Sequence, residues 1–266
     1  MKQTNVFMKL GRGMGGKNWR KGWQTKMKVD YDEATPSWED SHRYGPAPRW
    51  RRRVLIRMIK KLKIKTACDV GCAQPFLMLD MYRLGGGKLE ISGCDISKPV
   101  IETNAKLYPG MKFFCCDLNE PLGKGRKKYD LVTCSEVIEH LENYQMAVKN
   151  ICAMSRKYVL ITVPSGRRYP TDIKLGHLRH YEPDMLVDLL KENGFRALKV
   201  MRTGFPIFSV FKWLVNFLSR FTGIADTYLA NNYGLVQRFV ATCVYLTFYL
   251  NIFPFGNQLI ILAKKQ

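Results

Sequence analysis

Four short apolar runs between residues 66 and 141 each end in an acidic residue, a glycine or both. The residues that stand at these ends are Gly71, Asp95, Asp117 and Glu136. A carboxylate accepts hydrogen bonds from hydroxyl and amine groups, and a glycine lets a ligand approach the backbone closely. The four positions therefore predict one site for a ligand that carries hydroxyl and amine groups.

The elements that must position these residues are the strands of a parallel α/β sheet. Short apolar runs alternate with helical patterns along the chain, and such sheets bind ligands at the carboxyl ends of their strands. The predicted strands are 64–70, 89–95, 111–116, 129–134, 157–163, 195–202 and 257–264, and the predicted helices are 48–63, 75–84, 98–107, 142–155 and 183–194.

The spacing of three of these residues fits an adenosine-containing ligand. Gly71 follows a buried strand, where the free N–H groups of the next helix can receive a polar group. Asp95 lies 24 positions later, which suits hydrogen bonding to ribose hydroxyls, although a helix N-cap role competes and Ser97 competes for that cap. Asp117 is placed to accept from an exocyclic amine or to act as an ordinary turn residue.

Longer motifs around these residues resemble those of a known family. They are Ala67-Cys-Asp-Val-Gly-Cys-Ala-Gln74, Cys94-Asp95, Cys116-Asp-Leu-Asn-Glu-Pro-Leu122 and Tyr129-Asp-Leu-Val-Thr-Cys-Ser-Glu-Val-Ile-Glu-His-Leu141. In this order they are similar to the motifs of class I S-adenosylmethionine-dependent methyltransferases of the small-molecule type. The resemblance implies an α/β fold with a Rossmann-like seven-stranded sheet in the order 3-2-1-4-5-7-6. It also implies an antiparallel last strand, helices on both faces, and an apolar helical insertion before that strand.

The resemblance further implies the cofactor contacts. The methionine moiety would face Asp69 and Gly71, the ribose Asp95 and the adenine Asp117. The full set is Asp69, Gly71, Cys72, Ala73, Asp95, Ile96, Asp117, Leu118 and Ser135. One departure is Gly71-Cys-Ala-Gln-Pro75 in place of the usual Gly-x-Gly-x-Gly, and it raises a catalytically degenerate cofactor-binding protein as an alternative.

Candidate catalytic residues follow the fourth strand. Methyl transfer to oxygen or nitrogen needs alignment and often a base for the proton, and His140 suits that role near neutral pH. We expect His140, Glu136 and His180 to be catalytic, with Glu139 orienting His140. The competing interpretations are that His140 caps a helix and that His180, within His177-Leu-Arg-His-Tyr181, only begins one.

A rival interpretation starts from the same residues. Glu136-x-x-Glu139-His140 with a downstream histidine resembles the metal site of Hen-family methyltransferases, which modify RNA 2′-hydroxyls. A metal-dependent RNA 2′-O-methyltransferase is therefore an alternative, and basic charge suits RNA. The same string occurs in metal-free relatives, and the aromatic C-terminal segment suits a lipid better than phosphates. We predict no bound metal and O-methylation of a small-molecule or lipid-linked acceptor.

Charge and cysteine content bear on partners and location. The formal net charge is +21, which predicts attraction to an anionic surface. Eight cysteines without a CxxC pair indicate a reducing compartment and no zinc site of usual spacing. The basic N-terminus has no apolar signal segment. We expect a cytoplasmic enzyme in peripheral contact with the anionic inner membrane surface, with nucleic acid the less favoured partner.

Composition divides the chain into four parts: a basic extension at 1–47, a core at 48–204, an apolar segment at 205–255 and a final strand at 256–266. Residues 239–255 carry no charge, and their number is at the lower limit for a bilayer span, about 17–25 residues. Three interpretations of the apolar segment stay open: a buried cap over the acceptor site, a pair of helices at a membrane interface, and a true span.

Overall fold

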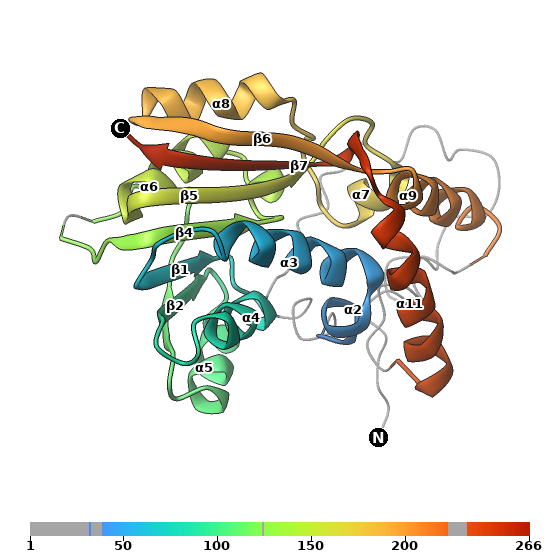
Figure 1. Ribbon diagram of the computed structural model, residues 1–266, viewed down its shortest axis with the longest axis horizontal. Coiled ribbons are helices and arrows are strands. Elements are labelled where there is room, and N and C mark those ends of the chain that lie inside the picture. Colours follow the sequence, from blue (N-terminus) through green and yellow to red (C-terminus); the bar gives the residue numbers. More distant parts are fainter. Residues whose placement is uncertain (1–31, 33–38, 124, 223–232) are drawn as a thin grey trace, which may run out of the picture.

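The centre of the molecule is a seven-stranded sheet in the order β3-β2-β1-β4-β5-β7-β6 (Figure 1). This computed structural model describes residue 32 and residues 39–123, 125–222 and 233–266. All strand pairs are parallel except those of β7, which runs antiparallel to both β5 and β6. The predicted fold class and strand order are confirmed. Of the predicted basic extension at 1–47, residues 1–31 and 33–38 lie outside the described residues.

The strands lie close to their predicted positions. They are β1 (Thr66–Val70), β2 (Glu90–Asp95), β3 (Lys112–Cys115), β4 (Tyr129–Ser135), β5 (Ser155–Pro164), β6 (Phe195–Phe205) and β7 (Phe253–Lys265). The helices of the core are α2 (Glu39–Tyr44), α3 (Pro46–Ile59), α4 (Phe76–Leu84), α5 (Lys98–Leu107), α6 (Tyr144–Met154), α7 (Pro170–Lys174) and α8 (Pro183–Glu192), with a 3-10 turn η2 (Ile138–His140) after β4.

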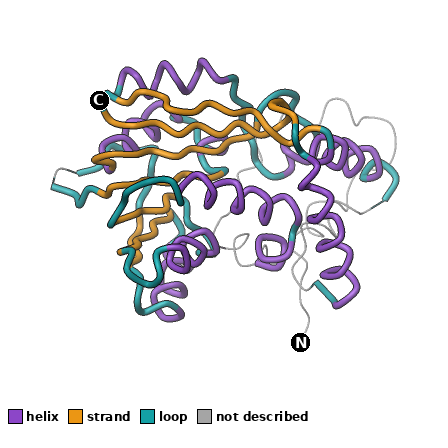
Figure 2. Tube along the Cα trace, in the orientation of Figure 1, coloured by secondary structure: helices purple, strands orange, loops and turns teal. Residues whose placement is uncertain are grey.

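Helices cover both faces of the sheet (Figures 1 and 2). One face packs on α6 and α8, where Val132 of β4 shares a buried cluster with Ile151 and Leu186. The other face packs on α3, α4 and α5, where Leu131 shares a second cluster with Ile59. Neighbouring residues of one strand therefore face opposite layers, as strand geometry requires. The ends of the strands are left free for a site.

In α3 the sequence places Trp50, Val54, Met58 and Leu62 four residues apart, a spacing that predicts an apolar stripe along a helix. Trp50 and Met58 are buried as this spacing predicts, whereas Leu55 and Ile59 are also buried and Leu62 lies beyond the end of the helix. A spacing of four residues drifts around a helix of about 3.6 residues per turn, so a buried face cannot follow it for long. The arginines of α3 are therefore distributed over more than one side of the helix.

The apolar segment before β7 forms α9 (Ile207–Leu218), α11 (Leu235–Thr247) and a 3-10 turn η3 (Phe248–Leu250). The uncharged stretch 239–255 is thus divided between a helix, a turn and the start of β7. Among the described helices, none is long and apolar enough to cross a membrane. The buried cap and the interfacial pair stay open as interpretations of this segment.

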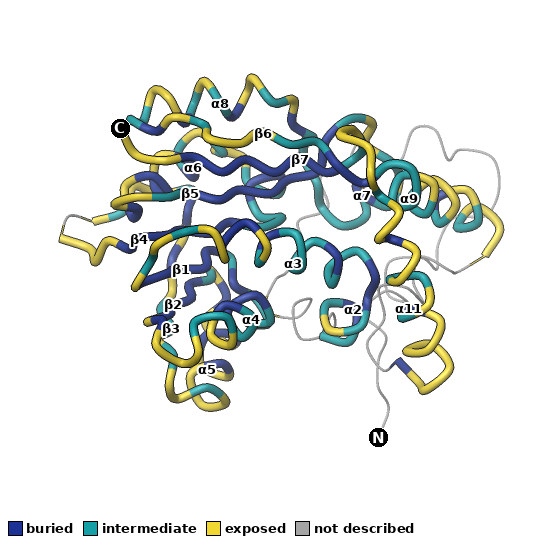
Figure 3. Tube along the Cα trace, viewed as in Figure 1, coloured by how far each residue is buried: buried dark blue, intermediate teal, exposed yellow. Residues whose placement is uncertain are grey.

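An aromatic cluster anchors this insertion to the core. The ring of Trp50 in α3 lies 5.8 Å from that of Phe208 in α9 and 6.1 Å from that of Phe248 in η3. Phe211 of α9 packs on Phe248 at 5.7 Å. The opposite sides of α9 and α11 are exposed (Figure 3). One side of the insertion thus belongs to the core, and the other presents apolar side chains to the surroundings.

Candidate functional site

One large cavity, of about 1430 Å³, opens at the carboxyl ends of β1, β2, β3 and β4. All nine predicted cofactor contacts line it, and so do Glu136 and His140. A second part of its wall comes from outside the sheet. We call this part the α9 chamber, and its apolar lining is Ile173, Leu175, Phe208, Phe211 and Val215.

The turn after β1 is closed by Gly71. Its φ is +69°, and its N–H donates to the carbonyl of Cys94 at 2.8 Å. A Cβ at this position would lie 2.3 Å from Cγ2 of Val137. Glycine is therefore required here for two reasons, the left-handed backbone and the close approach of the chain that follows β4.

The side chains of Asp95 and Asn104 fix the backbone at Ala73, where the sequence departs from the glycine-rich motif. Ala73 has a φ of +39°, its N–H donates to Asp95 at 3.0 Å, and its carbonyl accepts from Asn104 of α5 at 2.7 Å. Pro75 stands at the N-cap of α4, where its missing N–H removes no helical hydrogen bond. The loop therefore forms a defined turn without the second and third glycines.

Asp95 positions the loop and can still accept hydrogen bonds from a ligand. One carboxylate oxygen accepts from the N–H of Ala73, and the other accepts from the N–H of Ser97 at 3.1 Å. Two carboxylate oxygens offer about four acceptor sites, so hydroxyl groups in the cavity can still donate to it. Ser97 is the N-cap of α5, and its Oγ accepts a hydrogen bond from the N–H of Val100. Of the two candidates for this cap, Asp95 and Ser97, the structure therefore shows Ser97.

Asp69 and Asp117 lie in contrasting environments. Asp69 is buried and accepts from Thr133 Oγ1 at 2.6 Å. Burial raises the pKa of Asp69 to about 7, the Asp95 charge adds to this, and the Thr133 hydrogen bond opposes it. Asp117 is exposed at the rim and accepts from the N–H of Asn119 at 2.8 Å. The two carboxylates mark the inner and outer ends of the cavity's cofactor side.

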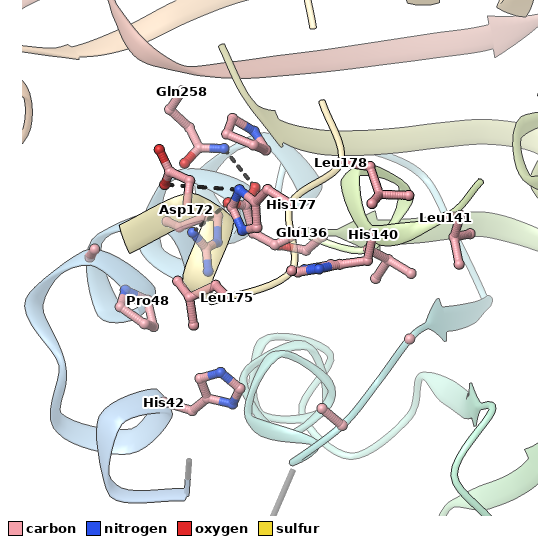
Figure 4. Close-up of a pocket in the computed structure, with 18 of the residues that line it drawn as sticks. His42, Pro48, Glu136, His140, Leu141, Asp172, Leu175, His177, Leu178 and Gln258 are labelled. Carbon is pink, nitrogen blue, oxygen red and sulfur yellow. Dashed lines mark hydrogen bonds and ion pairs between the residues drawn. The ribbon is translucent and has the colours of Figure 1, made fainter. Parts of the chain in front are cut away.

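Glu136 joins three elements at the tip of β4 (Figure 4). Its φ is +58°, uncommon for a residue with a Cβ. Its carboxylate accepts from Gln258 of β7 at 2.8 Å and lies 3.2 Å from the guanidinium of Arg51 in α3. A third contact comes from Thr162 Oγ1 at 3.1 Å. With these partners Glu136 is better suited to hold the pocket together than to take a proton.

Two neutral histidines lie side by side on the acceptor side. The rings of His140 and His177 are 4.8 Å apart, edge to face, and both line the cavity. Burial lowers the pKa of each, and the positive forms of its neighbours His140 and Lys212 further lower that of His177. Both rings are therefore neutral near pH 7, and a neutral imidazole can accept a proton.

Glu139 does not orient His140. Its side chain is fully buried, and neither carboxyl oxygen has a hydrogen-bond partner among the described residues. Burial, followed by the charge of Glu136, raises the pKa of Glu139 well above its ordinary value. Burial therefore favours the neutral form of this carboxyl group, which lies beneath the cavity wall.

The segment His177-Leu-Arg-His-Tyr181 fastens the chain after β5 to η2. The N–H of Leu178 donates to the carbonyl of Glu139 at 2.8 Å, and the buried Tyr181 hydroxyl donates to Ile138 at 2.9 Å. His180 and Tyr181 are not among the described residues that line the cavity, whereas His177 is. His180 instead contacts Gly166 through Nδ1 at 3.0 Å.

Sequence reasoning missed the residues that hold α9 over the cavity. Lys212 lies 2.9 Å from the carboxylate of Asp172 in α7, and the Asn216 side chain accepts from the N–H of Thr171 at 3.1 Å. These contacts join segments about forty residues apart, and no local motif contains both partners. The only signal was the polar Lys212 and Asn216 within an aromatic run.

The rival metal site is only partly assembled. Glu139, His140 and His177 offer ligand atoms that lie within 4.8 Å of one another. Glu136, the fourth member of the resembling motif, is instead paired with Arg51 and bonded by Gln258. A guanidinium beside that carboxylate disfavours a nearby divalent cation, since like charges repel. The four-ligand arrangement is therefore not formed.

A sheet in this order with acidic residues along one cavity edge is the architecture of class I S-adenosylmethionine-dependent methyltransferases, and the pocket fits that cofactor through its Gly71 turn and Asp95. A family model described as "Methyltransferase domain" matches residues 41–200, so the chain belongs to this methyltransferase family. The chain is thus a methyltransferase enzyme with S-adenosylmethionine as its methyl donor, as predicted.

Individual relatives are more distant. The ubiquinone biosynthesis O-methyltransferase of Coxiella burnetii is 31% identical over 98 residues, which cover 35% of this chain and 40% of that protein. The matched region thus spans well under half of the relative's length. Solved structures with a similar fold include a putative methyltransferase bound to Haloferax volcanii Trm112 and the [4+2]-cyclase SpnF. The first has a TM-score of 0.58 and 13% identity, and the match covers 90% of this chain and 99% of that one. The second has a TM-score of 0.56 and 19% identity, and the match covers 88% of this chain and 93% of that one.

Proposed function

We propose that this enzyme transfers a methyl group to a hydroxyl oxygen of a small-molecule or lipid-linked acceptor held in the α9 chamber. The observation that carries the proposal is the chamber itself, an apolar extension of the cofactor cavity roofed by α9. The weakly similar Coxiella burnetii relative, named as an O-methyltransferase, supports oxygen as the acceptor atom.

The cofactor supplies an electrophilic methyl group on a sulfonium. His140 accepts the proton of the acceptor hydroxyl as the new carbon–oxygen bond forms, because its imidazole is neutral and lines the cavity. Glu136 aligns the site through Arg51 and Gln258. His180 acts as a positioning residue behind His177, within 3.4 Å of its ring.

The acceptor reaches the chamber from an anionic membrane surface at the cytoplasmic side, where the enzyme binds peripherally. Support comes from the net charge of +21 and from the exposed apolar sides of α9 and α11. A surface that is both basic and apolar suits the interface of an anionic bilayer.

The test is transfer of label from methyl-labelled S-adenosylmethionine into fractionated cell extracts. We expect label in the organic-solvent fraction, in a form that resists mild base as a methyl ether does, and no label with Gly71→Ala. Label found in the RNA fraction and dependent on Mg²⁺ or Mn²⁺ would favour the RNA alternative. Base-labile label would mean a methyl ester instead.

A further inference from the structure

A second cavity lies on the outer side of α3, next to the methyl-transfer pocket, and Arg52 lines both. Its volume is about 490 Å³. Among the described residues, four arginines line it together with one carboxylate, that of Asp80. We call it the arginine pocket, and its charged lining is Arg49, Arg52, Arg53, Arg83 and Asp80.

Two of these arginines rest on aromatic rings of α11 and η3. The guanidinium carbon of Arg49 lies 4.1 Å from the ring centre of Tyr245, and that of Arg53 lies 3.7 Å from that of Tyr249. Arg49 also donates to Thr242 Oγ1 at 3.1 Å. A guanidinium that rests on a ring face keeps its edge N–H groups for other acceptors, and that fork matches phosphate oxygens.

The positive charge of the pocket is poorly balanced. Arg52 and Arg83 share Asp80, at 3.2 and 3.4 Å. Within residues 39–123, 125–222 and 233–266, Arg49 and Arg53 form no ion pair with a carboxylate. Burial lowers the pKa of Arg52. The Asp80 carboxylate raises this pKa, and the neighbouring charges of Arg51 and Arg49 lower it further. A bound anion would relieve this repulsion.

The opposite side of α11 is apolar and exposed. The residues that face α3 are Thr242 and Tyr245 of α11 and Tyr249 of η3, while Arg238 of α11 rests on Tyr44 of α2. Those between them are exposed, with Val236 at 76% and Phe239 at 71%, together with Leu235, Val240, Leu246, Leu250 and Ile252. Soluble surfaces rarely leave so many adjacent large apolar side chains uncovered without a partner.

We propose that the arginine pocket binds the phosphate of an anionic phospholipid while the exposed side of α11 enters the acyl region of the same bilayer. This inference rests on the proposed membrane-surface function and assigns its headgroup site. Charge complementarity selects the occupant, because a phospholipid offers a phosphate and adjoining hydrocarbon together. A protein partner would have to match both features separately.

The test compares sedimentation of the full-length protein with vesicles of phosphatidylcholine alone and of phosphatidylcholine mixed with phosphatidylglycerol. The variant is Arg49→Gln/Arg53→Gln, and the matched control is Lys60→Gln/Lys61→Gln, which removes equal charge from exposed positions at the end of α3. Each basic residue at an anionic surface is worth about 1 kcal/mol, so two give an affinity change of about thirtyfold. Arg83→Gln, at a mostly exposed side chain, is a milder second variant.

We expect the arginine variant to lose about thirtyfold in affinity for the mixed vesicles and the lysine control to lose much less. Equal losses would mean unspecific charge and overturn the site. Displacement by millimolar inorganic phosphate would mean a site for free phosphate and would also overturn it. Melting and S-adenosylhomocysteine binding confirm that each variant is folded. Transfer of label to the organic extract in detergent reports the proposed function separately, because no bilayer is then needed.

Discussion

The guanidinium of Arg51 lies 3.2 Å from the carboxylate of Glu136, and both side chains are shielded, at 16% and 20% exposure. The contact joins α3, which precedes the sheet, to the tip of β4. It also brings a charge from the basic helix into the cavity. The acceptor side of the site is therefore built from parts of the chain that lie far apart in sequence.

Replacing Arg51 by alanine tests this link. Glu136 would lose its charged partner, and leaving a shielded charged group without its partner costs about 1–3 kcal/mol. We expect a lower melting temperature and at least a tenfold lower rate of methyl transfer. Arg57→Ala, at an exposed position of α3, is the control and should change neither. A normal rate in the Arg51 variant would contradict a role for the pair.

Replacing Gly71 by alanine tests the cofactor turn. The new Cβ would meet Val137 at 2.3 Å, so we expect loss of S-adenosylhomocysteine binding by calorimetry. Gly86 provides the control, since its φ is also positive, at +57°, but nothing lies within 4 Å of an added Cβ. Gly86→Ala should cost about 1–2 kcal/mol of stability and leave binding intact. Equal effects on binding would mean that strain alone is responsible.

The pKa of Asp69, about 7, predicts pH-dependent cofactor binding. By the family resemblance, Asp69 faces the amino-acid end of the cofactor, and its ionised form attracts an ammonium group. Affinity for S-adenosylhomocysteine should therefore rise as pH increases from 6 to 8, with proton release on binding below pH 7. Calorimetry in buffers of different ionisation enthalpy measures that proton. In Asp69→Asn, affinity should be weaker and nearly independent of pH over this range.

Replacing His140 by glutamine tests the proposed base. Loss of a positioned base costs about 10²–10⁴-fold in rate, while cofactor affinity should stay unchanged. Because burial lowers the pKa of His140, the neutral ring persists below the usual pH of 6.5. With saturating cofactor, the wild-type rate should therefore hold to a pH below about 6.5 before it falls. An unaltered rate in the variant would show that His140 only shapes the cavity.

The strand tips of the site could be predicted from sequence because each follows from a local pattern. Asp95 ends an apolar run at a spacing that the strand–helix–strand unit fixes, and the structure brings it beside Gly71 through Ala73. The role of Asn104 was not predicted. Its side chain donates to the carbonyl of Ala73 from the middle of α5, and the sequence does not show which side of that helix faces the turn.

The acceptor side was harder to predict for a physical reason. His177 rather than His180 reaches the cavity because the intervening turn is set by hydrogen bonds to η2, which no periodicity encodes. The apolar residues of the insertion serve two environments at once, with Phe208 inward and Phe239 outward. Hydrophobicity alone cannot separate these roles.

Strand β6 lies at the edge of the described sheet and pairs there with β7, and α9 and α11 lie between the two strands in sequence. During synthesis on the ribosome, β6 emerges first and must wait for some fifty residues of apolar chain before it can join the sheet. During that interval the nascent polypeptide exposes the unpaired edge of β6 together with the apolar helices α9 and α11. A chaperone, or early contact with lipid, would protect it from aggregation during this delay.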